Sequence, residues 1–556
     1  MRTPMKKVFT LLLFGLLLSS CSFEQVLLKG AKPVSHPVTQ TPAYKALNPY
    51  QQDYLFAARL IRESYPDWES ILSPAAFDAL EQAGIAALAL PCSPQEFRWE
   101  LQRLLATFRN DHTRQLKSWY PKEPLFYPYQ LNYAPRNEGY GWYIERIDSI
   151  YGASWIGCWV DQIGNRCLDS LSAAFGEMTA REHEYGIRDD LYRRWLFSRP
   201  RLLARMDVDT AQGLSLECSC PDGPRQLRVA PGPSKSFNLQ SQKPRRSHSK
   251  PRQDGFWYQA IEDKGYGYFQ FNGMFDREVV MDGLKTYVRA PIRPLARLFL
   301  RREYRRALKG KSTRWIRPNA EDFDAFLQEV FTDLNAKNLR TLVIDLRNNG
   351  GGDLEMARPL LYALAPQAAV RPIQDYIYLS PLSMSQFQEE WKALDRACQK
   401  LNQSLPADGT LVNVDSLEIA AGLEQADFFA PVMDPRSPVY FRPPVPEYDG
   451  QVIFLVGPQT GSAAAGLATL VKDNGIGQLV GTVVSERPEG ATAVSRVNLP
   501  NSKEEISISV WYKKRPAPEA PKDVLLPDHW VEADKDSYLN TADPVLNWVE
   551  MHLIGR

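Results

Sequence analysis

The stretch "GQVIFLVGPQTGSAAAGLATLVKDNGIGQLVG" (450–481) decides the fold. A run of strand-forming residues ends in a turn of small residues, an alanine-rich helix follows, and a second apolar run predicts another strand. Strands and helices in alternation, with continuously apolar strands, are typical of a mostly parallel sheet covered by helices.

The same alternation runs through the C-terminal half of the chain. The segment 320–338 predicts a helix, and "LRTLVIDLR" (339–347) predicts a buried strand. We therefore expect the α/β fold class over 255–556, with a mixed, mostly parallel sheet flanked by helices. Ligand sites in such sheets gather at the carboxyl ends of strands. Two of these ends stand out, at 344–353 ("IDLRNNGGGD") and 454–462 ("FLVGPQTGS").

A single hydroxyl, Ser462, stands at the start of the predicted alanine-rich helix among small residues. Small neighbours let a substrate backbone pass close. The amide of Ala463 would lie at a helix N-terminus, where free N–H groups favour negative charge and suit a tetrahedral oxyanion. Ser462 is therefore either a nucleophile or only the cap of the helix.

Three glycines, Gly350, Gly351 and Gly352, follow the strand predicted at 339–347. Glycine lets the backbone take positive φ angles and approach a ligand closely. Phosphate binding is not indicated, because no Lys-Ser/Thr pair follows and no GxGxxG is present. The glycines either present amides to an oxyanion or form a tight turn between strand and helix.

In order along the chain, "GYGYFQFNGMF" (265–275), the Gly-rich turn, the Ser462 turn and "VLLPDHWVE" (524–532) resemble the tail-specific, or C-terminal processing, serine peptidase family. The resemblance covers roughly 255–532, with an insertion around 376–445. It implies a crotonase-like core of ββα units and peptide-bond hydrolysis with Ser462 as nucleophile. It also implies oxyanion donors at Ala463 and at Gly350 or Gly351, and no metal or organic cofactor.

Many members of that family take the serine proton with a lysine from the segment after the serine. Here that segment reads "VGTVVSERPEG" (480–490), with Arg487 at the corresponding position. A guanidinium stays protonated and accepts no proton. Lys472 lies three turns into the predicted helix and points away from its start. We therefore expect no lysine dyad.

Tricorn-like members of the family resemble this chain in another way, because they take a histidine from an N-terminal helical segment. "LLATFRNDHTRQL" (104–116) offers His112 after an amphipathic helix. An imidazole titrates near pH 6.5 and suits a general base. The alternative is a helix-end histidine bonded to a local carbonyl. The other five histidines lie in less suitable segments: His36, His183, His248, His529 and His552.

A histidine base needs an acceptor that orients it. Tricorn-like members resemble this chain in having a carboxylate shortly before the "PD" pair, and Glu519 is the nearest match, with Asp523 as an alternative. Each could equally be a loop carboxylate. Asp111 is adjacent to His112, but neighbouring side chains rarely face one another.

The first 21 residues carry a basic segment, an apolar run and Cys21. The run is too short for a permanent membrane helix and predicts a secretory signal. Leu18, Ser19, Ser20 and Cys21 resemble a bacterial lipobox, which implies cleavage before Cys21 and attachment of lipid to it. An ordinary signal with an incidental cysteine is the alternative. Residues 22–45 would be the tether.

Between tether and sheet, the sequence predicts three further parts. Residues 46–130 have helical periodicity, residues 131–230 show short strands with turns, and residues 231–254 are a Pro-, Ser- and basic-rich linker. The stretch "GCWVDQIGNRCLDSL" (157–171) resembles a PDZ domain, so a degenerate PDZ-like domain is expected at 131–230.

Six cysteines remain after Cys21 and allow 15 pairings. Cys158 and Cys167 flank a predicted hairpin and are the first expected pair. No CxxC or HExxH pattern occurs, so no structural zinc is expected.

Composition gives a near-neutral chain of 556 residues, net charge +1 and 44% hydrophobic, which indicates no nucleic-acid partner. Residues 289–317 are rich in Arg and Lys and form either a solvated helix face or a contact for anionic lipid. We expect a lipid-anchored serine endopeptidase that acts on proteins or peptides in the bacterial cell envelope, at the periplasmic face of the outer membrane. The alternative is an inactive binding or envelope-structure protein on the same scaffold.

Overall fold

The computed structural model describes residues 34–554 except 138, 211–212, 245–254, 277–292, 295, 299–300, 302–321, 367–369, 425 and 438. Cys21, the signal segment and most of 289–317 lie outside the described residues. Among the helices that are described, none has the length and apolar character needed to cross a membrane.

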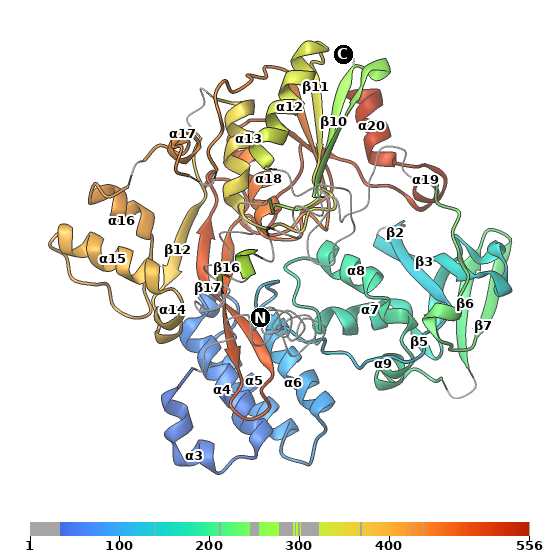
Figure 1. Ribbon diagram of the computed structural model, residues 1–556. Helices are drawn as coiled ribbons and strands as arrows, with labels where there is room; N and C mark the ends of the chain where they lie inside the picture. The colour runs from blue at the N-terminus through green and yellow to red at the C-terminus, as the bar shows by residue number, and fades with distance from the viewer. Residues whose placement is uncertain are drawn as a thin grey trace, which may run out of the picture.

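A six-stranded sheet forms the centre of the C-terminal part (Figure 1). Its strands run in the order β18 (His529–Trp530), β15 (Gln478–Gly481), β14 (Gln451–Val456), β11 (Thr341–Asp345), β10 (Tyr266–Phe271) and β9 (Phe256–Ile261). All neighbours are parallel except β9 and β10. The mostly parallel sheet predicted from the apolar runs is confirmed.

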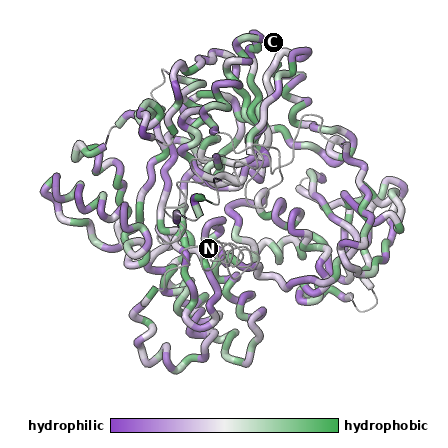
Figure 2. Tube along the Cα trace, in the orientation of Figure 1, coloured by the Kyte–Doolittle hydropathy of each residue, from purple (hydrophilic) through white to green (hydrophobic). Residues whose placement is uncertain are grey.

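Helices cover both faces of this sheet. Leu342 and Ile344 of β11 belong to one core with α12 (Phe323–Ala336), α13 (Ala357–Leu364) and α18 (Ala463–Asp473). Val343, between them, packs on the opposite face with α20 (Pro544–His552). This alternation follows from the two-residue period of a strand. Figure 2 shows the hydrophobic stretches concentrated along these strands and the helices beside them.

A second sheet combines a strand from the N-terminal part of the chain with strands from its C-terminal half. Its order is β1 (Arg114–Gln115), β17 (Glu505–Lys514), β12 (Gln374–Tyr378) and β13 (Leu411–Val412), with β16 (Gly490–Asn498) also paired to β17. Helices α4 (Pro49–Ser64), α5 (Pro74–Ala87) and α6 (Pro94–Ala106) share one core with Val497, Ile506 and Ile508 of this sheet. In Figure 1 the orange-red β16 and β17 reach into the blue N-terminal helices.

The segment expected as a tether is folded in its second half. Residues 34–45 include a 3-10 turn (Pro37–Gln40) and α3 (Pro42–Lys45), and His36 and Tyr44 are buried against the N-terminal helices. The prediction of a tether rested on the proline and polar residues of this segment and missed the buried rings of His36 and Tyr44. For residues 22–33 it stays a prediction.

Residues 129–240 form a third part with an antiparallel, seven-stranded sheet. Its strands are β2 (Tyr129–Arg136), β3 (Gly139–Asp148), β4 (Trp159–Ile163), β5 (Arg166–Cys167), β6 (Leu214–Cys220), β7 (Gly223–Val229) and β8 (Leu239–Gln240). Helices α7 (Leu168–Glu177), α8 (Glu184–Arg193) and α9 (Pro200–Arg205) are inserted between β5 and β6. Strand β8 pairs with β3, so the first part of the expected linker belongs to this sheet.

The expected pairing of Cys158 with Cys167 is wrong. Cys158 forms a disulfide with Cys220, and Cys167 is a free, exposed thiol. The hairpin register places Gln162, not Cys158, opposite Cys167. Strand β6 instead lies beside β4, with Ser219 opposite Trp159, which brings Cys220 next to Cys158.

Candidate active site

Ser462 lies at the junction between β14 and α18, half-buried and in a strained backbone conformation. Its φ is 49° and its ψ is −125°, a region that residues with a side chain rarely adopt. Its side chain makes no capping hydrogen bond to the helix. The interpretation of Ser462 as a helix cap is therefore wrong, because the hydroxyl is not used for that purpose.

The two strand ends singled out in the sequence meet at this serine. The Thr460 hydroxyl donates to the Leu346 carbonyl at 2.9 Å, and the Gly461 amide donates to the Asn349 carbonyl at 2.9 Å. Gly351 has φ +98°, and a Cβ there would stand 2.6 Å from the Cβ of Ser462. The glycine is required because the loop passes directly over the serine.

The backbone amides around Ser462 differ in their partners. The Gly351 amide donates to Asn349 Oδ1 at 2.9 Å and is therefore engaged. In the described part of the chain, the amides of Gly350 and Ala463 donate no hydrogen bond. Ala463 is the first residue of α18, where the helix dipole favours negative charge. Of the two glycines considered, Gly350 thus has the amide open to a ligand.

His112 reaches this region because β1 pairs with β17, nearly 400 residues later in the chain. Arg114 lies opposite Ser507, whose hydroxyl donates to the His112 carbonyl at 2.5 Å. Asn110 fixes the turn, since its Oδ1 accepts from the amides of His112 and Thr113, both at 3.0 Å. The "NDHT" stretch is thus a turn that presents His112 toward the catalytic part.

A carboxylate that the sequence analysis did not select, Glu486, joins the serine and the histidine. Its Oε1 accepts from the Ser462 amide at 2.5 Å and lies 3.9 Å from His112 Nε2. Its Oε2 lies 3.2 Å from Lys513 Nζ. Glu486 directly precedes Arg487, the residue at the family's lysine position. A buried acid one residue from that position was the available signal.

The charges at the site fit a neutral histidine beside an ionised glutamate. Burial raises the pKa of Glu486, but His112, Lys513 and the Ser462 amide outweigh it and bring the pKa to about 2. Burial lowers the pKa of His112, and Glu486 opposes this only in part. At 3.9 Å from Glu486, His112 Nε2 forms no hydrogen bond with this carboxylate.

The other acids proposed from the sequence lie elsewhere. Glu519 is exposed, and among the described contacts none joins it to His112. Asp523 is exposed and lies 4.0 Å from Arg487 Nε. Asp111 forms an ion pair with Arg181 instead of orienting its neighbour. Glu519 therefore stays a prediction, and Glu486 is the carboxylate that this geometry places at the histidine.

Two further residues from the sequence analysis have structural roles. Lys472 pairs with Asp528 at 2.6 Å, away from Ser462, as its helix position indicates. The His183 ring caps α8, because Nδ1 accepts from the Gly186 amide at 3.3 Å while Nε2 contacts the Val484 carbonyl. Burial lowers the pKa of His183 to about 4, so this ring is neutral as well.

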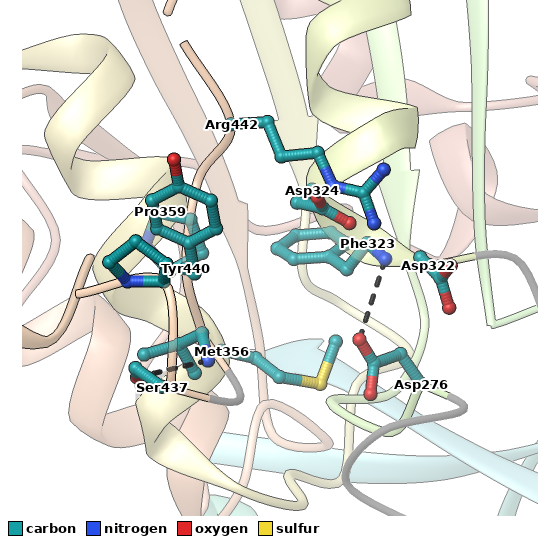
Figure 3. Close-up of a pocket in the computed structure, with 11 residues that line it drawn as sticks. Asp276, Asp322, Phe323, Asp324, Met356, Pro359, Ser437, Tyr440 and Arg442 are labelled. Carbon is teal, nitrogen blue, oxygen red and sulfur yellow. Dashed lines mark hydrogen bonds and ion pairs between the residues drawn. The ribbon is translucent and has the colours of Figure 1, made fainter. Parts of the chain in front are cut away.

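A separate pocket of about 170 Å³ lies beside the start of α12 (Figure 3). Asp276, Asp322 and Asp324 lie on one side, and Arg442 is 3.6 Å from Asp324. None of the site residues predicted from the sequence lines it. Within the described ranges, no group of acidic, histidine or cysteine side chains has the arrangement of a metal site.

Comparison with known proteins finds one matching family model and several structures with a similar fold. A family model described as "Peptidase family S41" matches residues 315–516, a range that includes Gly350, Ser462, Glu486 and Lys513. No curated protein sequence matches the chain. The structure of mature CPAF is 14% identical, with a TM-score of 0.56, and the match covers 92% of this chain and 96% of that one.

Two further solved structures are similar. Mature CPAF complexed with lactacystin is 15% identical with a TM-score of 0.56, over 92% of this chain and 98% of that one. The photosystem II D1 C-terminal processing protease is 12% identical with a TM-score of 0.37, over 90% and 97% of the two chains. At these identities, the likeness to CPAF shows a shared fold.

Proposed function

We propose that this chain, a serine-type peptidase of family S41, cleaves its protein or peptide substrates with Ser462 as nucleophile and His112 as general base. One observation carries the proposal: the Ser462 amide and the His112 ring face the same oxygen of Glu486. A nucleophile and a base that face one carboxylate match what acyl transfer requires.

The chemistry proceeds in two steps. The Ser462 hydroxyl attacks the substrate carbonyl carbon and its proton passes to His112 Nε2. The amides of Ala463 and Gly350 hold the resulting oxyanion. His112 then gives the proton to the leaving amine, so the acyl group remains on Ser462. Water, deprotonated by His112, hydrolyses this ester and frees the serine. Glu486 stabilises the imidazolium in both steps.

Labelling with a fluorophosphonate tests these roles, because Ser462 must displace fluoride from phosphorus in the same way as it attacks a carbonyl. The purified wild-type protein should be labelled, Ser462→Ala should not, and His112→Ala should be labelled at least about 100-fold more slowly. His529→Ala is the matched control, because His529 packs on Trp548 in the described structure. Labelling that persists in Ser462→Ala would place the nucleophile elsewhere. An unlabelled wild type would favour a binding protein on this scaffold.

We further propose that the protein is exported and anchored by lipid on Cys21, at the periplasmic face of the outer membrane. The support is the basic and apolar N-terminal segment and its lipobox-like ending. Mass spectrometry of the N-terminal peptide is the check: a chain that begins at an unmodified residue would contradict the anchor. Contact of 289–317 with anionic lipid is a second proposal, supported only by the density of basic residues there.

The PDZ-like character of the β-rich part also belongs to this proposal. It is supported by an antiparallel sheet with an inserted helix, α7, after the β4–β5 hairpin. The helices α8 and α9, inserted at the same place, distinguish it from a simple peptide-binding module.

A further inference from the structure

A buried lysine, Lys513, lies near the end of β17 and faces carboxylates from three separate segments. Its Nζ is 3.2 Å from Oε2 of Glu486, in the loop after β15. Asp375 of β12 is its partner in the register between β12 and β17. Glu182, from the connection between α7 and α8, is the third acid that interacts with it electrostatically. Lys513 itself is only 9% exposed.

Lys513 is a cation and therefore not the base of a lysine dyad. Burial lowers its pKa, but Glu486 and Glu182 outweigh this and raise the pKa above its ordinary value. An ammonium that keeps its proton cannot accept one from Ser462. Its chemistry at this place is that of a fixed positive charge with three hydrogen-bond donors.

The position of Lys513 decides how the two oxygens of Glu486 are used. With Oε2 on the ammonium, Oε1 is left for the Ser462 amide and faces His112. Without the ammonium, Glu486 would be a buried carboxylate with only the amide and the imidazole as partners. Such a group either rotates toward a new donor or takes up a proton.

We propose that Lys513 is a positioning residue of the peptidase site, which holds Glu486 so that its carboxylate charge faces His112. This inference rests on the proposed function of Ser462 and His112. It assigns to β17 a second contribution to the site, since the same strand pairs with the segment that carries His112.

Other charged groups set the direction of the expected effect. Burial lowers the pKa of His112 and Glu486 raises it. The nearby cations Lys513, Arg114 and Arg181 lower it further. Asp111 interacts with Glu486, and Glu182 accepts from the Arg487 amide at 2.5 Å and from Asn110 Nδ2 at 3.1 Å. When Lys513 is neutralised, Glu486 leaves its place beside His112 or takes up a proton, whereas the other charged groups remain. Glu486 acts on the pKa of His112 more strongly than Lys513 does, so loss of Glu486 outweighs loss of the ammonium and moves the titration of His112 downward.

The test measures the rate of fluorophosphonate labelling between pH 5 and pH 9 for the full chain. Wild type should show a rate that rises with pH as His112 loses its proton. In Lys513→Met the maximal rate should fall by roughly 10- to 100-fold, and the inflexion should move to lower pH, because Glu486 no longer holds its charge beside His112. Lys472→Met is the matched control, because its ion pair with Asp528 has a distance of 2.6 Å but lies outside the site. It should leave rate and inflexion unchanged.

The outcomes separate this inference from the proposed function. If the wild type is not labelled at all, the proposed function fails, and this inference with it. If the wild type is labelled and Lys513→Met keeps its inflexion, only the role of Lys513 is overturned, even where the rate falls. Should Lys513→Met not fold, Lys513→Gln takes its place. Its amide keeps a donor for Glu486 without the charge, so the inflexion should move up instead, and a downward shift or no shift would overturn the inference. If Lys513→Arg folds and neither Lys513→Met nor Lys513→Gln does, the positive charge is needed for folding, and the inference is overturned.

Discussion

At the scale of single residues, the site depends on how Ser462 is held. Its backbone has φ 49° and ψ −125°, and its amide donates to Glu486 instead of to solvent or a neighbouring carbonyl. Strain of this kind costs on the order of 1–3 kcal/mol and persists only where surrounding contacts fix it. The hydrogen bond to Glu486 is such a contact, so this carboxylate stabilises the turn as well as facing the histidine.

Replacement of Glu486 by glutamine should slow labelling of Ser462 by roughly 100-fold, because the imidazolium loses the negative charge that stabilises it. The pH inflexion should move down, as is expected for Lys513→Met, since Glu486 raises the pKa of His112. The rate is measured per folded molecule, with folding monitored by circular dichroism.

Glu489→Gln provides the control for this change. Glu489 is buried three residues later and pairs with Lys522 at 2.9 Å, so the variant also removes a buried carboxylate from an ion pair. An upward shift or no shift in Glu486→Gln would contradict the assignment of Glu486 to the histidine.

At the scale of elements, the site arises where two parallel strands end side by side. β11 and β14 are neighbours, so their carboxyl-terminal loops emerge at one edge of the sheet. Gly351 then lies against Ser462, with no room for a side chain between the loops. The glycine-rich turn and the serine turn work as one unit for this reason.

The substitution Gly351→Ala should abolish most labelling while leaving the protein folded. The new Cβ would stand 2.6 Å from Ser462 Cβ and 2.7 Å from the Gly461 carbonyl, at φ +98°. One of the loops must shift, which displaces the Gly350 and Ala463 amides proposed to hold the oxyanion, and loss of one such donor costs roughly 100- to 1,000-fold in rate.

Gly475→Ala is the matched control for the backbone effect. Gly475 has φ +65° at the end of α18, and an added Cβ there meets no atom within 4 Å. It should lower stability by about 1 kcal/mol without slowing the labelling. Equal labelling rates in the two alanine variants would show that the Gly351 loop is not part of the site.

Local pattern in the sequence was enough to predict the parallel sheet and the two turns of small residues after β11 and β14, because each depends on residues close together in the chain. The partners of His112 were not accessible in the same way. Glu486 and Lys513 reach it through the pairing of β1 with β17, and no periodicity in either segment specifies that pairing. The pairing of Cys158 with Cys220 was missed for the same reason. Cys220 lies on β6, which pairs with β4 although three helices separate the two strands in the sequence.

At the scale of the whole molecule, three parts of the chain meet at the site. The N-terminal helices deliver His112, the sheet containing β14 delivers Ser462, and the β-rich part contributes the connection between α7 and α8. Figure 1 shows α7 and α8 between the strands of the β-rich part and the rest of the molecule. In that connection, Glu182 bridges Asn110 and the Arg487 amide, so it joins all three parts.

Glu182 should make the stability of the assembled molecule depend on pH. Burial, followed by the charge of Glu486, raises its pKa to about 8 from an ordinary value of 4.5, while Lys513 opposes the shift. Between these two values the folded protein keeps the proton and the unfolded chain has lost it, so stability falls as pH rises through this window. Asp111, with its pKa raised to about 7 by burial, adds to the same trend.

Glutamine at position 182 cannot ionise, so Glu182→Gln should flatten this dependence. The loss of Tm between pH 5 and pH 8 should be smaller than in wild type by a few degrees, since about 1 kcal/mol shifts Tm by roughly 2–4 °C even in domains of 150–250 residues. Glu184→Gln is the control, since the Glu184 side chain is 70% exposed two positions later. Differential scanning calorimetry at several values between pH 5 and pH 8 measures the Tm of each protein. If Tm falls with pH equally in wild type and Glu182→Gln, the Glu182 carboxyl is ionised in the folded protein over the whole range and paired with Lys513. The junction of the three parts would then be stabilised by an ion pair and not by a protonated carboxyl.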